Sequence, residues 1–410
     1  MAPLWKLCAH GKVTEVKAAL AKGVDVNGRR GGNETALMTT AGQVMCECHS
    51  GCQVVILRLL LEQPGIQVNL ADMEGCTALH YATSEGSRNA VALLIADKRV
   101  DVNCRDSSQM TPLMMAAASN FICIVKLLLA DQRVEVNHVT KDNNTALHIA
   151  AKRQNTSIVE LLLADPRVDV NCKDSQQLTP LVKLTVAYGP GYVDVLKLFL
   201  AEPRVDVNLP STLDDEPNGE ITPLMCSVLF SNFEAAKLLL DNPRVEVSWK
   251  NSLGLTAFHL VLSPSESGHK DNMHKVLQLF LAHPKVEVNY KDLPAKTTIL
   301  HVAAGFSTVE AVKLILAESR FTSANALAPI DEFKKAGRIT ALGVAAAKGN
   351  CEIFKELVLH PSIDLDVKNE EGLDVDGQAG APVAGLWVEA EPGQGVVTLQ
   401  HVPTHDSRQL

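Results

Sequence analysis

The densest cluster of residues with metal-binding or redox chemistry spans positions 46–52, where the sequence is Cys-Glu-Cys-His-Ser-Gly-Cys. Sulfur and nitrogen donors that could hold Zn²⁺ or Cu(I) come from Cys46, Cys48, His49 and Cys52. Zinc sites, however, usually draw ligand pairs from two segments, and Cys46-x-Cys48 is tighter than the usual pair. The alternative, which this spacing favours, is a loop of reduced thiols. Metal or redox sensing here is therefore a secondary hypothesis, and no bound metal is predicted.

Histidine recurs at one position of a repeating pattern, as His80, His148, His259 and His301. A catalytic histidine would be singular, so the recurrence indicates a structural role such as hydrogen bonding between neighbouring turns. The chain also lacks the phosphate-binding glycine loop, the Gly-x-Ser-x-Gly nucleophile turn and the His-Glu-x-x-His zinc helix. The sequence therefore predicts a protein that is not an enzyme and that uses no cofactor.

The composition favours many small aliphatic cores over one large core. Of the 410 residues, 46% are hydrophobic but only 4% are aromatic, and the net charge is −9. An acidic chain without clustered Lys and Arg argues against nucleic acid as the main partner. No apolar run reaches the length of a membrane helix, and residues 1–20 lack the apolar core of a signal peptide. We therefore expect neither a nucleic-acid partner nor a membrane partner.

The ten cysteines are scattered along the chain. Cys104 and Cys172 occupy the same position of the pattern two units apart. In a stack of helices spaced roughly 8–10 Å apart they would be about 20 Å from each other. That separation exceeds the ~7 Å limit for a disulfide. Unpaired cysteines are typical of a reducing compartment, so we expect a cytoplasmic protein, with the nucleus as the alternative.

The elements that must position these residues are organised as a repeat. Each unit opens with a threonine, and three of them, Thr111, Thr145 and Thr179, are 34 residues apart. The same separation relates the asparagines that end a Val-x-Val-Asn motif, such as Asn103 and Asn137. A unit of 34 residues that recurs with insertions predicts a solenoid, in which each repeat buries its apolar faces on its neighbours.

One repeat shows how the unit is built. Thr111 is suited to cap the first turn of a helix, and Pro112 suits its first position because proline has no N–H to lose there. A second helix with a strong apolar face is predicted from Ile122 to Ala130. An Asp-x-Arg or Asp-Pro-Arg segment ends it. The alternating Val-Glu-Val-Asn that follows predicts an extended piece leading into a polar turn.

This helix–turn–helix–hairpin unit resembles the ankyrin repeat. Residues 77–82 are Thr-Ala-Leu-His-Tyr-Ala, residues 145–150 are Thr-Ala-Leu-His-Ile-Ala, and residues 298–303 are Thr-Ile-Leu-His-Val-Ala. The resemblance covers residues 4–372, in about ten repeats that start near positions 4, 35, 77, 111, 145, 179, 222, 256, 298 and 340. It implies an all-α ankyrin-repeat solenoid with a hairpin finger in each repeat. One departure is systematic: the family's glycine after the second helix is replaced by Asp/Glu-Pro-Arg.

Beyond residue 372 the pattern stops. Residues 373–410 are rich in Gly, Pro and Glu and lack helical periodicity. Such a composition cannot bury enough apolar surface to offset the entropy of ordering. The sequence therefore predicts two domains, a repeat domain over residues 1–372 and a disordered tail over residues 373–410.

The fingers of the later repeats carry the candidate binding residues. Trp249 and Tyr290 occupy the position after the Val-x-Val-Asn motif on successive fingers, with Ser248 in place of Asn before Trp249, and Leu209 has that position one finger earlier. An insertion beside them adds three acidic residues, Asp214, Asp215 and Glu216. Trp and Tyr are favoured anchors of protein interfaces. The sequence predicts an aromatic and acidic patch that suits a basic segment, and the alternative is that the aromatic rings brace their own hairpins.

The resemblance implies a concave binding surface lined by fingers and inner helices. The main hypothesis is a monomeric, non-catalytic scaffold, adaptor or inhibitor that binds another protein. The alternatives are a regulatory or targeting subunit of a phosphatase or ubiquitin ligase, and the metal or redox sensor already described. Because ankyrin stacks serve many processes, the fold does not determine the partner.

Overall fold

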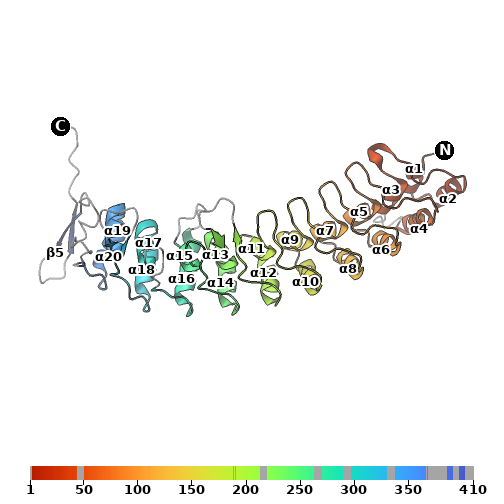
Figure 1. Cartoon of the computed structure of the whole chain (residues 1–410). Helices are drawn as coiled ribbons and strands as arrows, with labels where there is room; N and C mark the ends of the chain where they lie inside the picture. Colours follow the sequence, from red (N-terminus) through yellow and green to blue (C-terminus); the bar gives the residue numbers. More distant parts are fainter. Residues whose placement is uncertain are drawn as a thin grey trace, which may run out of the picture. The chain divides into compact units, whose positions relative to one another are not determined.

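The computed structural model describes residues 2–43, 50–187, 189, 191–212, 219–262, 270–289, 297–329, 338–365, 367, 386–390 and 397–401. The chain divides into two compact units, Met1–Ser211 and Thr212–Leu410. Both units consist of helix pairs, and a loop that we call a finger connects one pair to the next (Figure 1).

Two rows of helices form the N-terminal unit, which is coloured red to yellow-green in Figure 1. Within each row, every helix packs on the next one along the unit. The inner row consists of α1 (Leu4–Ala9), α3 (Ala36–Gly42), α5 (Ala78–Ser84), α7 (Pro112–Ala118), α9 (Ala146–Lys152) and α11 (Pro180–Thr185). The outer row consists of α2 (Val13–Ala21), α4 (Ser50–Leu61), α6 (Arg88–Ala96), α8 (Ile122–Ala130), α10 (Thr156–Ala164) and α12 (Tyr192–Ala201). A 3₁₀ turn, η1 (Gly31–Asn33), precedes α3.

The C-terminal unit continues the alternation of short inner and longer outer helices. Its inner helices are α13 (Pro223–Leu229), α15 (Ala257–Leu260), α17 (Ile299–Phe306) and α19 (Ala341–Lys348). Its outer helices are α14 (Phe233–Asp241), α16 (Lys270–Ala282), α18 (Val309–Ala317) and α20 (Cys351–Leu359), which pack each on the next. Short strands are β1 (Ser211–Thr212), β2 (Glu220–Ile221), β3 (Ala328–Pro329), β4 (Arg338–Ile339), β5 (Leu386–Ala390) and β6 (Val397–His401).

The predicted boundary at residue 372 stays a prediction, because residues 368–385 lie outside the described residues. The described part of the C-terminal segment is one antiparallel pair, in which β5 runs beside β6 with Leu386 opposite His401. The remainder of the predicted disordered tail is outside the description as well. The predicted solenoid of helices is confirmed.

Each inner helix after α1 begins at the threonine that marks the repeat. Thr111 Oγ1 accepts the N–H of Met114 at 3.4 Å, and Thr179 Oγ1 accepts that of Val182 at 3.2 Å. Pro112 and Pro180 follow as the first residues of α7 and α11, as expected. A threonine cap of this kind contributes about 1 kcal/mol, because it satisfies an N–H that has no partner within the helix.

His80, His148 and His301 link this cap to the next repeat. His148 Nδ1 accepts the backbone N–H of Thr145 at 3.3 Å, and its Nε2–H donates to the Leu178 carbonyl of the following finger at 3.2 Å. His301 repeats both contacts, with Ile339 as its carbonyl partner at 3.1 Å. Burial lowers the pKa of His148 to about 4, so the ring is neutral at pH 7. The structural role predicted for these histidines is confirmed.

The core of the stack is a continuous layer between the two rows. The inner helices contribute one leucine per repeat at an equivalent position, 1–2% exposed in each case: Leu79, Leu113, Leu147 and Leu181. The outer helices contribute residues such as Leu128 and Leu162, both 0% exposed. Burying one such side chain contributes about 1.5–3 kcal/mol. Because each leucine contacts its own repeat and its neighbour, the layer needs no large central core.

The asparagines of the Val-x-Val-Asn motif hold successive fingers together. Asn103 Nδ2 donates to the Arg133 carbonyl and its Oδ1 accepts the Glu135 N–H, both at 2.8 Å. Asn137 makes the same two contacts one repeat later, with Arg167 and Asp169. Each amide thus pairs with a segment about thirty residues further along the chain. The local turn contact belongs instead to an aspartate, since Asp101 Oδ1 accepts the Asn103 N–H at 2.9 Å.

At several joints an arginine ties one outer helix to the outer helix before it. Arg167 Nη2 donates to the Leu129 carbonyl in the last turn of α8 at 2.7 Å, and Nη1 reaches the Val134 carbonyl at 3.4 Å. The same guanidinium pairs with Asp165 through Nε at 3.0 Å and Nη2 at 2.6 Å. A cation is favourable there because the last carbonyls of a helix carry partial negative charge. We call this arrangement the arginine clamp; it recurs at Arg99, Arg133, Arg204 and Arg320.

The clamp explains the one systematic departure from the ankyrin pattern. A glycine is needed after a helix when that residue takes a left-handed conformation. Here the capping residues Asp131 and Asp165 have φ values of −86° and −82°, which any residue adopts. Asp and Arg therefore replace the glycine without backbone strain, and the guanidinium satisfies carbonyls that would otherwise face water.

Candidate protein-binding face

The exposed side of the inner helices changes character from repeat to repeat. Two residues after the invariant buried leucine, the equivalent half-buried position holds Tyr81, Met115, Ile149 and Lys183. The fingers cover this side of the helices along the N-terminal unit (Figure 1). We call the fingers together with these side chains the finger face.

The finger face is hollowed where the fingers after Asn103 and Asn137 meet α7 and α9. This hollow of about 520 Å³ is the Lys141 groove, lined by Ser108, Met110, Ala118, Thr140, Lys141, Asp142, Asn144, Ile149, Lys152 and Arg153. Met110, Ala118 and Ile149 are half-buried apolar side chains, and the cations Lys141, Lys152 and Arg153 are exposed. Side chains from two fingers and two helices therefore converge on one hollow.

Hydrogen bonds within the finger hold Lys141 and Asp142 in place. Thr140 N–H donates to the Asn144 carbonyl at 3.0 Å, and Asn144 N–H donates to Thr140 Oγ1 at 3.2 Å. Asn143 has a φ of +55°, in the left-handed region that Asn tolerates best after Gly. Because this turn is closed by its own contacts, the groove is formed without a ligand.

Lys183, on the adjacent helix α11, is a lysine of the finger face whose charge is neutralised by a carboxylate. Its Nζ donates to Asn144 Oδ1 at 2.8 Å and pairs with the Asp174 carboxylate, which is 2% exposed. Burial alone would raise the pKa of Asp174, but the hydrogen bonds from Lys183 and from the Leu178 N–H lower it below its usual value. Lys183 is thus a structural cation.

The cations of the Lys141 groove are not neutralised in this way. Among the described residues, no hydrogen bond or ion pair engages the head groups of Lys141, Lys152 or Arg153. Asp142 is the one carboxylate in the lining, so three cations and one anion leave a formal charge of +2. The chain as a whole has a net charge of −9. The groove is therefore a positive site on an acidic protein.

A cysteine and a histidine that lie close together do not form a nucleophile. Cys104 Sγ is 3.6 Å from His80 Nδ1, a spacing that resembles a nucleophile and its base. Burial, however, raises the pKa of the Cys104 thiol to about 12 and lowers the pKa of His80. His80 Nδ1 already accepts the Thr77 N–H at 3.1 Å, so it cannot take the thiol proton. Cys104 and His80 instead take part in the hydrogen bonds that join neighbouring repeats.

The predicted aromatic and acidic patch is described only in part. Leu209 and Trp249 are both half-buried, and each begins its finger as expected. They belong to different units of the chain. The other predicted members lie outside the described residues: Asp214, Asp215, Glu216 and Tyr290. The patch therefore stays a prediction.

The predicted metal loop also falls mainly outside the description. Cys52 is exposed on α4, whereas Cys46, Cys48 and His49 belong to the segment that is not described. Within the described residues, no three His, Cys, Asp or Glu side chains are grouped as a metal site would require. Metal binding at this loop stays a hypothesis.

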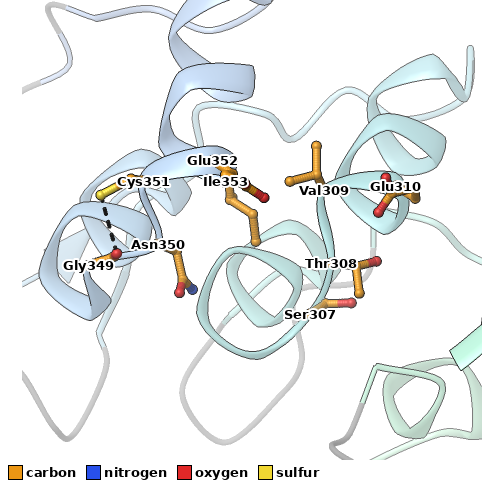
Figure 2. A pocket seen from close by; sticks show the side chains of 9 residues that line it. All are labelled: Ser307, Thr308, Val309, Glu310, Gly349, Asn350, Cys351, Glu352 and Ile353. Atoms are coloured by element: carbon orange, nitrogen blue, oxygen red, sulfur yellow. Dashed lines mark hydrogen bonds between the residues drawn. The ribbon is translucent and has the colours of Figure 1, made fainter.

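A second hollow lies between the first turns of α18 and α20 (Figure 2). It measures about 620 Å³, and Figure 2 shows that its lining comes from the start of α18, with Thr308 and Val309, and from the start of α20, with Asn350 and Ile353. Helix N-termini attract anions, but Glu310 and Glu352 already place carboxylates in both first turns. Asn350 Nδ2 is committed to the Ala304 carbonyl at 2.8 Å. This hollow offers no counterpart to the unneutralised charge of the Lys141 groove.

None of the residues that line the Lys141 groove is among the candidate binding residues predicted from the sequence. The sequence does, however, show the change in charge when the last residues of the inner helices are compared between repeats. Lys152 and Arg153 occupy the positions of Ser84 and Glu85 two repeats earlier. What the sequence does not show is that a finger closes over them to form a hollow.

Comparison with known families identifies the class of protein. A family model for ankyrin repeats (3 copies) matches residues 44–139, 93–174, 113–211 and 267–369, which together cover more than half of the chain. The chain belongs to the ankyrin-repeat family. No curated protein matches it. None of the described helices is long and apolar enough to cross a membrane.

Proposed function

We propose that this ankyrin-repeat protein is a non-catalytic scaffold, adaptor or inhibitor that binds a partner protein through its finger face. The observation that carries the proposal is the contrast between two helix positions in the same repeats. The buried position is leucine in every case, from Leu79 to Leu181, whereas the half-buried position two residues later varies from Tyr81 to Lys183. Packing accounts for the constant position. Packing does not fix the variable position, and two of its side chains, Met115 and Ile149, leave half-buried apolar surface for a partner.

Contacts between repeats also hold the finger face in place before a partner binds. Asparagine bridges and arginine clamps join successive repeats, so the fingers are held by a scaffold that binding does not have to order. A preformed surface loses little conformational entropy when a partner binds. Ankyrin repeats are protein-interaction modules, and the absence of an activated nucleophile at Cys104 fits a role without catalysis.

Affinity purification of the tagged full chain, followed by mass spectrometry, tests the proposal. We expect a partner that is lost when the finger face is altered by Trp249→Ala with Tyr290→Ala, or by Lys152→Glu with Arg153→Glu. The same partner should be retained by a matched outer-helix variant, Lys126→Glu with Lys197→Glu, because these lysines are exposed on α8 and α12. A partner that follows the outer-helix variant instead would refute the finger face as the binding surface.

The identity of the captured partner also distinguishes a scaffold, adaptor or inhibitor from a regulatory or targeting subunit. A phosphatase or a ubiquitin ligase that binds in equal amounts would make the chain a regulatory or targeting subunit. A partner without such an enzyme would leave the scaffold or inhibitor role.

A further inference from the structure

We propose that the Lys141 groove binds an acidic segment of the partner protein, in which Asp or Glu side chains face Lys141, Lys152 and Arg153. This inference rests on the proposed function, because it names the chemistry of the partner at one place on the finger face. The predicted aromatic and acidic patch has the opposite preference and lies elsewhere on the chain.

The first argument is that the charged residues take new positions in the finger that lines the groove. In the neighbouring fingers an aspartate closes the turn: Asp106 Oδ1 accepts the N–H groups of Ser108 and Met110, both at 2.8 Å. In the groove finger the equivalent residue is Thr140, whose hydroxyl accepts the Asn144 N–H instead. The turn is kept without a carboxylate at this position, and the carboxylate of the finger is instead Asp142, at the place of Ser108. The next residue is Lys141, where the neighbouring finger has Ser107.

The second argument is the matching change on the inner helix. The exposed pair at the end of α5 is Ser84 and Glu85, whereas the equivalent pair on α9 is Lys152 and Arg153. Lys152 in the last turn also suits the negative end of the helix dipole, so the helix tolerates it without a partner. Lys141 of the finger and the cationic pair Lys152 and Arg153 of the helix thus line the same hollow.

The third argument is that the surrounding cations are already engaged. Lys173 Nζ donates to the Pro210 carbonyl at 2.7 Å, and Lys183 pairs with Asp174. Arg105 reaches His138 Nε2 at 3.2 Å and Gln109 Oε1 at 3.4 Å. The donor groups of these cations therefore already have partners, whereas the head groups of Lys141, Lys152 and Arg153 are open to a ligand.

The size and polarity of the groove favour a peptide over nucleic acid. A formal charge of +2 within a chain of net charge −9 is far below the clusters of Lys and Arg that bind phosphate backbones. The half-buried Met110 and Ile149 would contact an apolar side chain placed between two carboxylates. Carboxylates of a partner would gain more here than in open solvent, because the hollow partly excludes water.

A pair of defined peptides tests this preference on the full chain. The probe is a fluorescent peptide of alternating Glu and Leu, and its control has Gln at every Glu. We expect the Glu peptide to bind and the Gln control to bind at least about tenfold more weakly, with an affinity that falls as salt rises. Lys141→Glu with Lys152→Glu should weaken the Glu peptide by at least about tenfold. Lys126→Glu with Lys197→Glu makes the same change in net charge on the outer helices and should leave the affinity unchanged.

Three results would overturn the inference. The Glu peptide could fail to bind the wild-type chain, it could bind the two charge-reversed variants equally, or a phosphorylated Ser peptide could bind tightly while the Glu peptide does not. Circular dichroism melts of both variants exclude loss of fold as the cause. The proposed function stands or falls separately, since a captured partner that ignores the groove variants refutes only the acidic segment. A chain that captures no partner refutes the proposed function, whatever the peptides show.

Discussion

The joint between α8 and α10 and the joint between α14 and α16 are built from similar outer helices but are closed differently. At the first joint, Arg167 binds the Leu129 carbonyl and the carboxylate of Asp165. At the second, the clamp position is Lys285, which follows His283 and Pro284. Within the described part of the chain, the Lys285 ammonium makes no hydrogen bond or ion pair.

The difference separates two contributions to stacking. Both joints bury leucines completely, Leu162 in one and Leu239 in the other. Apolar burial is therefore common to both joints, and the clamp is an addition. A guanidinium can span two carbonyls and a carboxylate because its five donors form a rigid fork, which an ammonium cannot reproduce. We infer that helices stack without the clamp, and that the clamp makes the joint more resistant to opening.

Truncation of the buried leucines should have the largest effect and should not distinguish the two joints. We expect Leu162→Ala and Leu239→Ala each to lower the free energy of unfolding by about 2–5 kcal/mol, because each leaves a cavity in the same layer. Urea denaturation followed by circular dichroism measures the change. Leu359→Ala is the control, since Leu359 is 61% exposed and should cost less than about 0.5 kcal/mol. A small effect at Leu239 alone would show that the two joints differ in packing as well.

Acid should lower the free energy of unfolding of both units of the chain through their buried histidines, His148 in the N-terminal unit and His301 in the C-terminal unit. The pKa values of His148 and His301 are lowered from 6.5 to about 4 by burial, so protons bind more readily to the unfolded chain. Their contribution to stability is complete above pH 6.5 and is lost as the pH falls towards 4. It amounts to on the order of 3 kcal/mol for His148. Chemical denaturation between pH 7 and pH 4 measures this loss, and His148→Gln should reduce the slope. A slope that His148→Gln does not change would place the acid sensitivity elsewhere.

Removal of one clamp should convert the first joint into the second. We expect Arg167→Lys to lower the free energy of unfolding by about 1–2 kcal/mol, because a lysine keeps the charge but loses the paired contacts with Asp165 and Leu129. Hydrogen exchange should show faster opening at the end of α8. Lys126→Arg on the exposed face of the same helix is the control and should change neither quantity. Equal exchange in wild type and Arg167→Lys would mean that the clamp does not secure the joint.

The reverse change should have the smallest effect. Lys285→Arg places a guanidinium at the joint that lacks one, and we expect a gain of about 0.5–1 kcal/mol. The gain is smaller because His283, and not an acidic residue, occupies the position of Asp165. Lys285→Arg with His283→Asp should therefore stabilise further, as measured by urea denaturation. A double variant no more stable than Lys285→Arg would show that the carboxylate adds nothing to the clamp.

The repeat fold could be predicted from local patterns because the same solution recurs. Thr111 and Pro112 mark a helix start by their own chemistry, and the range Ile122–Ala130 was predicted with the bounds that α8 has. The recurring histidines could be assigned a structural role because one function rarely needs four copies. The segments with inserted residues gave no such repetition. The predictions on them stay untested because the residues that they need lie outside the description: Cys46, Cys48, His49, Asp214, Asp215, Glu216 and Tyr290.

The amino-acid sequence by itself determined the order of the helices, their starts and their buried faces. These features depend on capping and on apolar periodicity over a few residues. What only the tertiary structure decided was which side chains meet across repeats. Asn103 ends a motif that predicted only an extended piece and a polar turn, but its amide bridges to Arg133 and Glu135 in the next repeat. Lys141 and Lys152 are neighbours in a groove only because a finger folds over the helix that follows it. Contacts of this kind depend on how repeats stack, which no single repeat encodes.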